Sequence, residues 1–325
     1  MKIILPGPWY RHPFFSSKIC LETEKQIEKI KDYGIRTVIF NSECGQPRKE
    51  GAGDAVDAPE KTGQTIAGYG ESADPSPEQM EIRQYMEEVI HDRTMPSPEK
   101  ARAVQKVSMF MMKNLLEQPT SSNIEEAKKS IGNVVDLIIR DDSTTRHLLQ
   151  ITSHDYQTYT HSVTVGFLGI ALSKVLFKGS DEHNLHELGA GFFLHDIGKV
   201  RIDTTIINKP ARLTAEEMAV MRRHPPYGYQ ILRDTRQLTH ECRQIVLQHH
   251  ERDDGKGYPL KLRGDEIHLY ARLCSIADVY EALTAFRPYK RRMTTFEALR
   301  LMKDEMLNHF HKDHFDQFVR LFTDT

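Results

Sequence analysis

Residues 249–259 read HHERDDGKGYP, a stretch in which two adjacent histidines precede a charged, glycine-containing loop that ends in Gly-Tyr-Pro. Two neighbouring histidines cannot both point into a helical core without cost, because successive side chains of a helix face different directions. Both can face one metal ion if the helix ends there. The stretch therefore predicts a hydrolytic metal site at a helix end.

Further residues that can bind a metal recur along the C-terminal half of the chain. An imidazole and carboxylate set suits iron, manganese or zinc, whereas calcium prefers oxygen ligands. The candidates exceed what one ion with an open position can use. Two ions that share Asp196 as a bridge, with a bridging water between them, would favour phosphoester hydrolysis. The seven candidate ligands are His161, His195, Asp196, His224, His249, His250 and Asp278.

Taken singly, several of these residues have a simpler interpretation. A lone helical histidine such as His161 or His224 is more often a surface or hydrogen-bonded residue than a ligand. Asp278 could equally be an exposed helix residue. The pair His195-Asp196 is more specific, because it follows the apolar run 185–194. Unpaired polar groups at the inner end of a buried helix are costly, and metal ligation would supply their partner.

The composition describes a globular chain of 325 residues with a net charge of −2. This charge excludes general coating of a nucleic-acid polymer. No apolar run approaches the roughly 18 residues of a membrane span, and the opening segment is too short for a signal peptide. We therefore expect no membrane insertion and a cytoplasmic location. The four cysteines show no CxxC spacing, which argues against a zinc ribbon or a disulfide framework.

The chain divides into four segments on local pattern. Residues 1–44 predict a small α/β domain, with a helix over 23–33 and a strand over 36–40. Residues 45–77 have no apolar period and predict a flexible linker. Residues 78–143 carry helix starts at Ser-Pro pairs and predict connecting helices, which join a regulatory module to an effector or serve as plain scaffold. Residues 144–325 are almost entirely helical in pattern.

The fold class predicted for the chain is therefore mainly α, with a helical bundle after the small α/β domain and the helical linker. Apolar residues dominate 161–177 and 185–194. Thr214 with Glu217, and Thr294 with Glu297, have the spacing of capping boxes at helix starts. In such a bundle we expect the candidate ligands on helix ends and in the loops between helices.

A series of motifs in fixed order makes the interpretation specific. LHDIGK (194–199) is followed by NKP (208–210), HP (224–225), HHER through GYP (249–259), IAD (276–278), ALT (282–284) and RPYK (287–290). This series resembles the HD-GYP family, a branch of the HD phosphohydrolase superfamily, over residues 144–325. The segment PWYRHPF (8–14) is similar to the small α/β domain that precedes many HD-GYP modules.

The resemblance implies a role for each matching residue. Two divalent ions, iron or manganese, are expected, with Asp196 and Lys199 as the catalytic pair. Lys199 would contact a scissile phosphate oxygen, and Arg287 and Lys290 would grip the phosphates of a cyclic dinucleotide. One ion would be held by His161, His195, Asp196 and Asp278, and the other by Asp196, His224, His249 and His250.

The family also implies a substrate and a partner. Its members hydrolyse cyclic di-GMP to pGpG, and some continue to GMP. The turn formed by Gly257, Tyr258 and Pro259 is expected beside the site, where it would contact proteins with GGDEF domains. A rigid turn is the simpler interpretation of these residues, and the two are compatible.

Two positions depart from the family pattern. Gln157 stands where some members hold a third metal through Glu, so two metals are expected. Glu281 stands where Asp is usual, and its longer side chain is expected to alter contacts with a base. No expected ligand is missing, so a hydrolase is the leading prediction. The alternatives are a non-catalytic cyclic-dinucleotide receptor and a hydrolase of another nucleotide, such as cyclic GMP-AMP. The end product, the input signal and the choice between monomer and homodimer are left open.

Overall fold

The computed structural model of the chain describes residues 2–4, 18–21, 24–32, 35, 38–40, 77–151, 158–285 and 291–323. The chain forms two compact units, residues 1–68 and 69–325. The expected linker 45–77 lies almost wholly outside the described residues. Each unit is described by itself.

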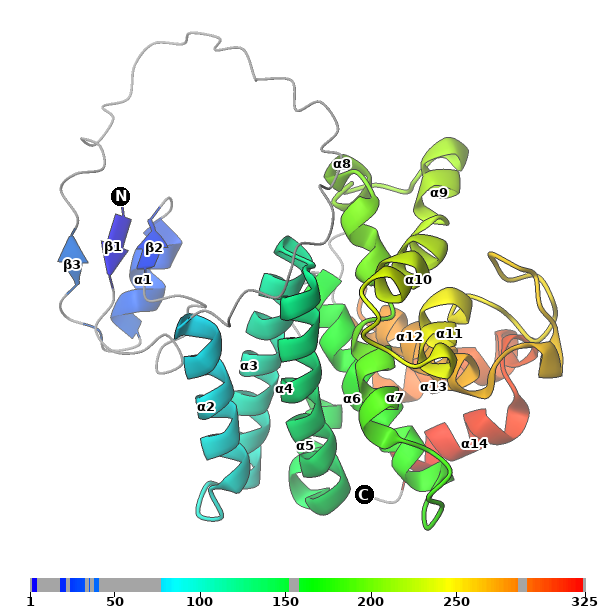
Figure 1. The fold of residues 1–325 in the computed structure, drawn as a ribbon, viewed down its shortest axis with the longest axis horizontal. Coiled ribbons are helices and arrows are strands. Elements are labelled where there is room, and N and C mark those ends of the chain that lie inside the picture. Colours follow the sequence, from blue (N-terminus) through cyan, green and yellow to red (C-terminus); the bar gives the residue numbers. More distant parts are fainter. Residues whose placement is uncertain are drawn as a thin grey trace, which may run out of the picture. The chain divides into compact units, whose positions relative to one another are not determined.

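The first unit contains a small antiparallel sheet and one helix (Figure 1). Strand β1 (Lys2–Ile4) lies between β2 (Lys18–Cys20) and β3 (Ile39–Phe40). Ile3 pairs with Ile19 on one side and with Phe40 on the other. Helix α1 (Glu24–Asp32) supplies Ile30, which is buried in one apolar cluster with Ile3. The described part of this unit therefore combines strands with a helix.

The described residues of the second unit are helical, which confirms the mainly α fold (Figure 1). Short 3₁₀ helices lie at Ile197–Arg201 (η2), Gly264–Glu266 (η3) and Leu307–His309 (η4). The α-helices are α2 (Pro77–His91), α3 (Ser97–Glu117), α4 (Ser121–Arg140), α5 (Asp142–Gln150), α6 (Thr158–Leu176), α7 (Leu185–Phe193), α8 (Thr204–Ile207), α9 (Ala215–Met221), α10 (His224–Asp234), α11 (His240–Gln248), α12 (Leu269–Thr284), α13 (Thr295–Glu305) and α14 (Lys312–Arg320).

Several helices of this unit begin where side-chain caps satisfy their first backbone N–H groups. Both predicted capping boxes are present: the Thr214 hydroxyl accepts from the Glu217 N–H at the start of α9, and Thr294 and Glu297 repeat the arrangement at α13. Each such cap is worth about 1 kcal/mol. The caps fix where these helices start.

Helix α6 is apolar on most of its surface because it is surrounded by other helices. It packs against α3, α4, α5, α7, α12 and α14. Its buried residues include Val163, Phe167 and Leu172. Among the described helices, none is long and apolar enough to cross a membrane.

The predicted connecting helices α3 and α4 are packed directly on the helices that lead to the candidate ligands. Helix α3 packs against α6, which carries His161, and α4 packs against α7, which ends just before His195. The contact faces are apolar and fully buried, with Val107 on α3 and Ile131 and Val135 on α4. The packing supports a scaffold role for these helices.

Candidate metal centre

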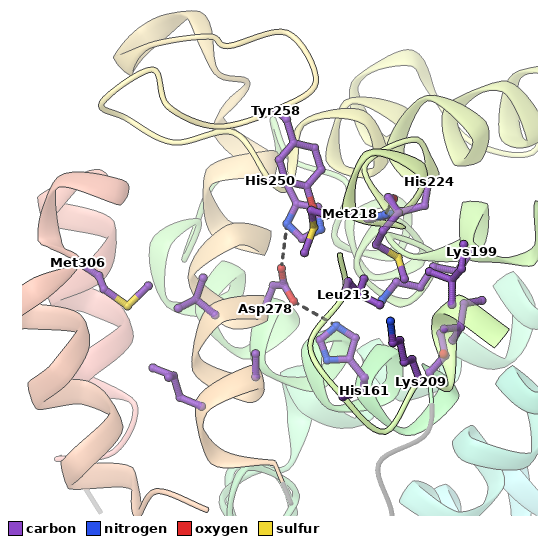
Figure 2. Close-up of a pocket in the computed structure, with 18 residues that line it drawn as sticks. His161, Lys199, Lys209, Leu213, Met218, His224, His250, Tyr258, Asp278 and Met306 are labelled. Carbon is purple, nitrogen blue, oxygen red and sulfur yellow. Dashed lines mark hydrogen bonds and ion pairs between the residues drawn. The ribbon is translucent and has the colours of Figure 1, made fainter. Parts of the chain in front are cut away.

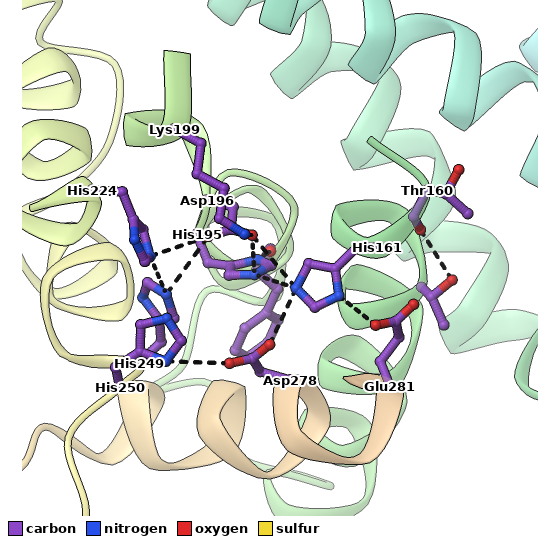
Figure 3. A network of polar contacts seen from close by, with 12 residues as sticks. Thr160, His161, His195, Asp196, Lys199, His224, His249, His250, Asp278 and Glu281 are labelled. Carbon is purple, nitrogen blue, oxygen red and sulfur yellow. Dashed lines mark hydrogen bonds and ion pairs between the residues drawn. The ribbon is translucent and has the colours of Figure 1, made fainter. Parts of the chain in front are cut away.

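The seven predicted ligands come from five segments of the chain and converge on one buried place (Figure 3). Each of them lies at or near the end of a helix, except Asp278, which lies within α12. Six are at least 92% buried, and the side chain of His250 is 26% exposed. His161 comes from the first turns of α6, His195 and Asp196 follow α7, His224 begins α10, and His249 and His250 follow α11.

Backbone carbonyls orient three of the imidazoles. The Nδ1 atoms of His195, His224 and His249 lie 2.8, 2.8 and 3.0 Å from the carbonyl oxygens of Phe192, Met221 and Val246. A carbonyl oxygen only accepts, so each Nδ1 donates its proton and each Nε2 presents a lone pair. Such outer contacts fix the tautomer of metal-binding histidines.

These lone pairs face other imidazole nitrogens across the site. The Nε2 atoms of His195 and His161 are 3.2 Å apart, and those of His224 and His249 are also 3.2 Å apart. The lone pairs of His224 and His249 at this distance repel unless a proton or a cation lies between them. Donor atoms that could hold a metal ion form three overlapping groups: His161, His195 and Asp278; His224, His249 and His250; and His195, Asp196 and His249.

Asp196 connects the two sides of this set. Its Oδ2 lies 3.5 Å from the Nε2 atoms of both His161 and His195. Its Oδ1 lies 3.2 Å from His224 Nε2 and 3.9 Å from His249 Nε2. One carboxylate therefore faces both groups of imidazoles, as a bridging ligand would.

Asp278 has a similar position on the opposite wall (Figure 3). Its Oδ1 lies 3.1 Å from His161 Nε2, and its Oδ2 lies 3.5 Å from His250 Nδ1. The resemblance assigned Asp278 to one ion only. The geometry shows that it, too, faces both sides of the set.

The electrostatics favour the ligand forms of most of these groups. Burial lowers the pKa of His224 to about 3 and that of His250 to about 4, so both are neutral near pH 7. Burial would raise the pKa of Asp196, but the charge of Lys199 and the nearby imidazoles hold it well below its usual value. Neutral imidazoles and ionised carboxylates are the forms that bind a metal ion.

A cavity of about 550 Å³ opens beside the histidines (Figure 2). Lys199, on η2, lines it and donates to Asp196 Oδ2 at 2.5 Å. Lys209 also lines it and is held by Glu217 at 2.6 Å. Its volume suits a nucleotide-sized ligand. The apolar part of its wall comes from Ile206, Ile207, Ala211, Leu213, Met218, Met221, Val279, Ala282, Leu283 and Met306.

The Gly-Tyr-Pro turn lies against this site. The Tyr258 ring stacks on His250 with 4.6 Å between ring centroids, and Tyr258 lines the cavity. Gly257 crosses the preceding backbone so closely that an added Cβ would lie 2.5 Å from the Arg252 nitrogen. Only glycine fits such an approach, which brings the turn directly beside the histidines.

Glu251 organises the same loop, a role that the sequence interpretation missed. The residue is 1% exposed, and its carboxylate accepts from the backbone N–H groups of Leu260, Lys261 and Leu262 at 2.6, 3.1 and 3.0 Å. Burial raises its pKa even against these donors. The only signal in the sequence was its place directly after the two histidines.

Glu281, whose longer side chain was expected to alter contacts with a base, contacts one of the predicted ligands. It lies one helical turn after Asp278, on the same face of α12, and its Oε2 lies 2.5 Å from His161 Nδ1. Burial opposes protonation of His161, but the charges of Glu281 and Asp278 raise its pKa well above the usual value. Glu281 does not line the 550 Å³ cavity. It contacts the Nδ1 atom of His161, whose Nε2 atom faces the other candidate ligands. Gln157, Arg287 and Lys290 lie outside the described residues.

Gly198 lets the segment after Asp196 approach the start of α10. A Cβ added there would lie 1.9 Å from the His224 carbonyl oxygen and 2.4 Å from the Gly228 nitrogen. We expect Gly198→Ala to lower the free energy of unfolding by about 1–3 kcal/mol, because two backbones must separate. Denaturant unfolding monitored by circular dichroism measures this change.

Gly132→Ala is the matched control for this substitution. Gly132 lies inside α4, and the nearest atom to its added Cβ is His186 Cδ2 at 3.4 Å. Alanine is the better helix former by about 1 kcal/mol, so this variant should be neutral or slightly more stable. Equal unfolding midpoints for Gly198→Ala and the unmodified chain would contradict the prediction.

Known protein families match both parts of the chain. The HD domain family matches residues 142–314, and a domain of unknown function (DUF3391) matches residues 1–139. The chain is 32% identical, over 97% of its length, to the cyclic di-GMP phosphodiesterase PA4108 of Pseudomonas aeruginosa, and covers 72% of that protein. The matches therefore extend over both the helical and the N-terminal segments.

Two further similarities cover less of the sequence or show only the fold. Over 136 residues the chain is 39% identical to the 3'3'-cGAMP-specific phosphodiesterase 2 of Vibrio cholerae, and it covers 26% of that protein. The solved structure of Bd1817, a HDG"Y"P protein from Bdellovibrio bacteriovorus, superposes with a TM-score of 0.64 at 22% identity. That superposition covers 74% of this chain and 78% of the other, and it shows a common fold.

Proposed function

Because the chain belongs to the HD-GYP family of HD-domain proteins, we propose that it is a metal-dependent phosphodiesterase that hydrolyses cyclic di-GMP to pGpG. The observation that carries the proposal is the position of Asp196, whose two oxygens face separate groups of imidazoles. A site built in this way suits two divalent ions with a shared carboxylate. Iron, manganese and zinc all fit such a mixed nitrogen and oxygen set, and we propose iron or manganese, as the family resemblance implies.

The proposed ligands divide into two sets around Asp196. When bound, the two ions would supply an activated water and polarise the phosphate oxygens. His161, His195 and Asp278 would hold one ion, and His224, His249 and His250 the other. Asp196 would contribute one oxygen to each. The carbonyl-bound Nδ1 atoms keep the Nε2 atoms of three of these histidines directed inward before any ion arrives.

Two lysines supply positive charge beside this centre. Lys199 donates to Asp196 and also faces the cavity, so its ammonium group can move to a phosphate oxygen of the substrate. Lys209 lies on the same wall, held by the Glu217 carboxylate. Arg287 and Lys290 are proposed as further phosphate contacts from the segment after α12. The methionine and leucine side chains of the wall can pack on the faces of the guanines.

The assay for this proposal is turnover of cyclic di-GMP by protein loaded with iron under anaerobic conditions, or with manganese. We expect linear pGpG as the first product, separated by liquid chromatography. Metal content is measured on the same samples by plasma mass spectrometry. Bound metal without any product would reject the enzymatic proposal and favour the non-catalytic receptor.

A hydrolase of cyclic GMP-AMP is the second candidate, because one similar protein is named for that substrate. The two activities are separated by comparing kcat/KM for cyclic di-GMP and cyclic GMP-AMP in one preparation. We expect the ratio to favour cyclic di-GMP, since the relative that matches along almost the whole chain is named for it. A ratio that favours cyclic GMP-AMP would replace the leading proposal.

The outer side of the Gly-Tyr-Pro loop is proposed as a contact for GGDEF-domain proteins. Lys256 and Leu260 flank the turn and are exposed, and Leu260 retains 53% of its surface. These two side chains offer a partner protein one positive charge and one apolar contact. On the inner side of the loop, Tyr258 stacks on His250. Binding of a partner to the outer side would therefore affect the metal centre through this contact.

A further inference from the structure

Glu281 is a buried acid outside the seven candidate ligands that contacts one of them. It is 3% exposed and lies on α12, and its Oε2 is 2.5 Å from His161 Nδ1 (Figure 3). It does not line the 550 Å³ cavity. A buried carboxylate is costly unless hydrogen bonds or an opposite charge compensate for the lost water. His161 supplies such a partner, so the two side chains form one unit.

The two nitrogens of the His161 ring face carboxylates on opposite sides. Asp278 Oδ1 lies 3.1 Å from Nε2, and Glu281 Oε2 lies 2.5 Å from Nδ1. The two acids are one helical turn apart on α12, which packs against the helix that carries His161. An imidazole is rigid and planar, so contacts at both nitrogens fix its orientation.

The outer contact of His161 differs in charge from those of three other histidines. The Nδ1 atoms of His195, His224 and His249 lie against backbone carbonyl oxygens, which carry no net charge. The Nδ1 atom of His161 meets a carboxylate. A carboxylate accepts a stronger hydrogen bond than a carbonyl oxygen does. Such an outer partner makes the Nε2 lone pair more basic and therefore a better metal ligand.

This contact makes the two proposed metal positions unequal. Asp196 and Asp278 each face both groups of imidazoles, so their charges are shared between the positions. Glu281 contacts His161, which belongs to one position only. Because the attraction between two charges falls with their distance, the charge of Glu281 favours an ion at His161 more than an ion at His224.

We propose that Glu281 is a positioning residue, which orients His161 as a metal ligand and makes the metal position at His161 the tighter of the two. This inference rests on the proposed metal centre. Glu281 would act through His161 and would not touch the substrate, since it does not line the cavity. The first ion is then expected to bind at His161, and the second at the position formed with His224.

Titration of the metal-free full chain with Mn²⁺ tests the inference in the absence of substrate. Electron paramagnetic resonance measures the free ion, and we expect two dissociation constants for the unmodified chain. Glu281→Gln keeps the size of the side chain and an acceptor oxygen but removes the charge. It should raise the lower dissociation constant about tenfold, and Glu281→Ala, which also removes the acceptor, about a hundredfold. The higher constant should change much less in both variants.

Variants of the histidines show whether Glu281 acts through His161. His161→Ala should still bind one ion at the other position, and adding Glu281→Gln should leave the affinity for that ion unchanged. In a His224→Ala chain, which retains His161, the same substitution should keep its effect of about tenfold. Equal effects of Glu281→Gln in the two backgrounds would overturn the assignment, because a purely structural role would affect both alike.

Glu187→Gln is the matched control. Glu187 lies in the first turn of α7, and its partly buried carboxylate contacts the Lys128 ammonium at 2.6 Å and the Thr239 N–H at 3.0 Å. This variant should leave both dissociation constants unchanged. Circular dichroism shows whether each variant is folded, and Glu281→Gln alone decides the question if Glu281→Ala does not fold.

Two results would contradict the inference in distinguishable ways. If both dissociation constants are unchanged, or equally changed, in a folded Glu281→Gln protein, the positioning role is wrong and the metal centre stands. If the unmodified chain binds no Mn²⁺, the metal centre is rejected and the role of Glu281 with it.

Discussion

Asp196→Asn is expected to remove the bound metal and to lower turnover of cyclic di-GMP by a factor on the order of 10³, the effect of losing a principal electrostatic group in an active site. The native carboxylate presents one oxygen to each group of imidazoles. An amide keeps the shape but has one oxygen and no charge. It also replaces the charged acceptor that Lys199 contacts at 2.5 Å by a neutral group. Metal content and turnover are measured on the same preparation.

Asp203→Asn is the control for Asp196→Asn. Asp203 caps α8 by accepting from the Thr205 N–H at 2.7 Å, and asparagine caps a helix equally well. This variant should keep its metal and its activity. Circular dichroism would show whether both variants remain folded. An Asp196→Asn protein that retains full metal content and wild-type turnover would exclude Asp196 as the bridging ligand.

Glu251→Ala is expected to lower the free energy of unfolding by about 1–3 kcal/mol, the usual cost of leaving buried hydrogen-bond donors without their acceptor. The native carboxylate accepts from three successive backbone N–H groups, at Leu260 through Leu262. Alanine leaves these donors without an acceptor in a place that is closed to solvent. Since the same loop holds Tyr258 against His250, turnover should fall as well. Guanidinium unfolding and steady-state kinetics measure the two effects.

Glu266→Ala separates this effect from the general loss of a loop carboxylate. Glu266 accepts from the Arg263 N–H at 2.8 Å in the same loop, but it is exposed to solvent. Water replaces such a bond, so the expected loss is at most about 1 kcal/mol. Similar losses for the two variants would show that burial of Glu251 contributes nothing special.

The candidate ligands could be predicted from the sequence because their positions conflict with ordinary helix patterning. Polar pairs such as His195-Asp196 and His249-His250 follow apolar helices, where only a metal or a strong partner would satisfy them. The motif order then grouped residues that are far apart in the chain. The capping boxes at Thr214 and Thr294 were predicted for a similar reason, since cap and carboxylate are three residues apart.

Other features depend on packing that no local pattern encodes. Glu251 and Glu266 both lie among charged residues, so the local sequence does not distinguish them. Only Glu251 is buried. The longer side chain of Glu281 was expected to alter contacts with a base, and its carboxylate lies beside His161, a contact that the sequence does not indicate.

The contact of α3 and α4 with α6 and α7 sets the minimum length of a fragment that can fold by itself. A fragment trimmed to residues 142–314, the region that matches the HD domain family, would strip both covering helices from α6 and α7. Their apolar faces would then meet water and favour aggregation. The shortest self-contained catalytic fragment should therefore begin no later than Ser97, the first residue of α3.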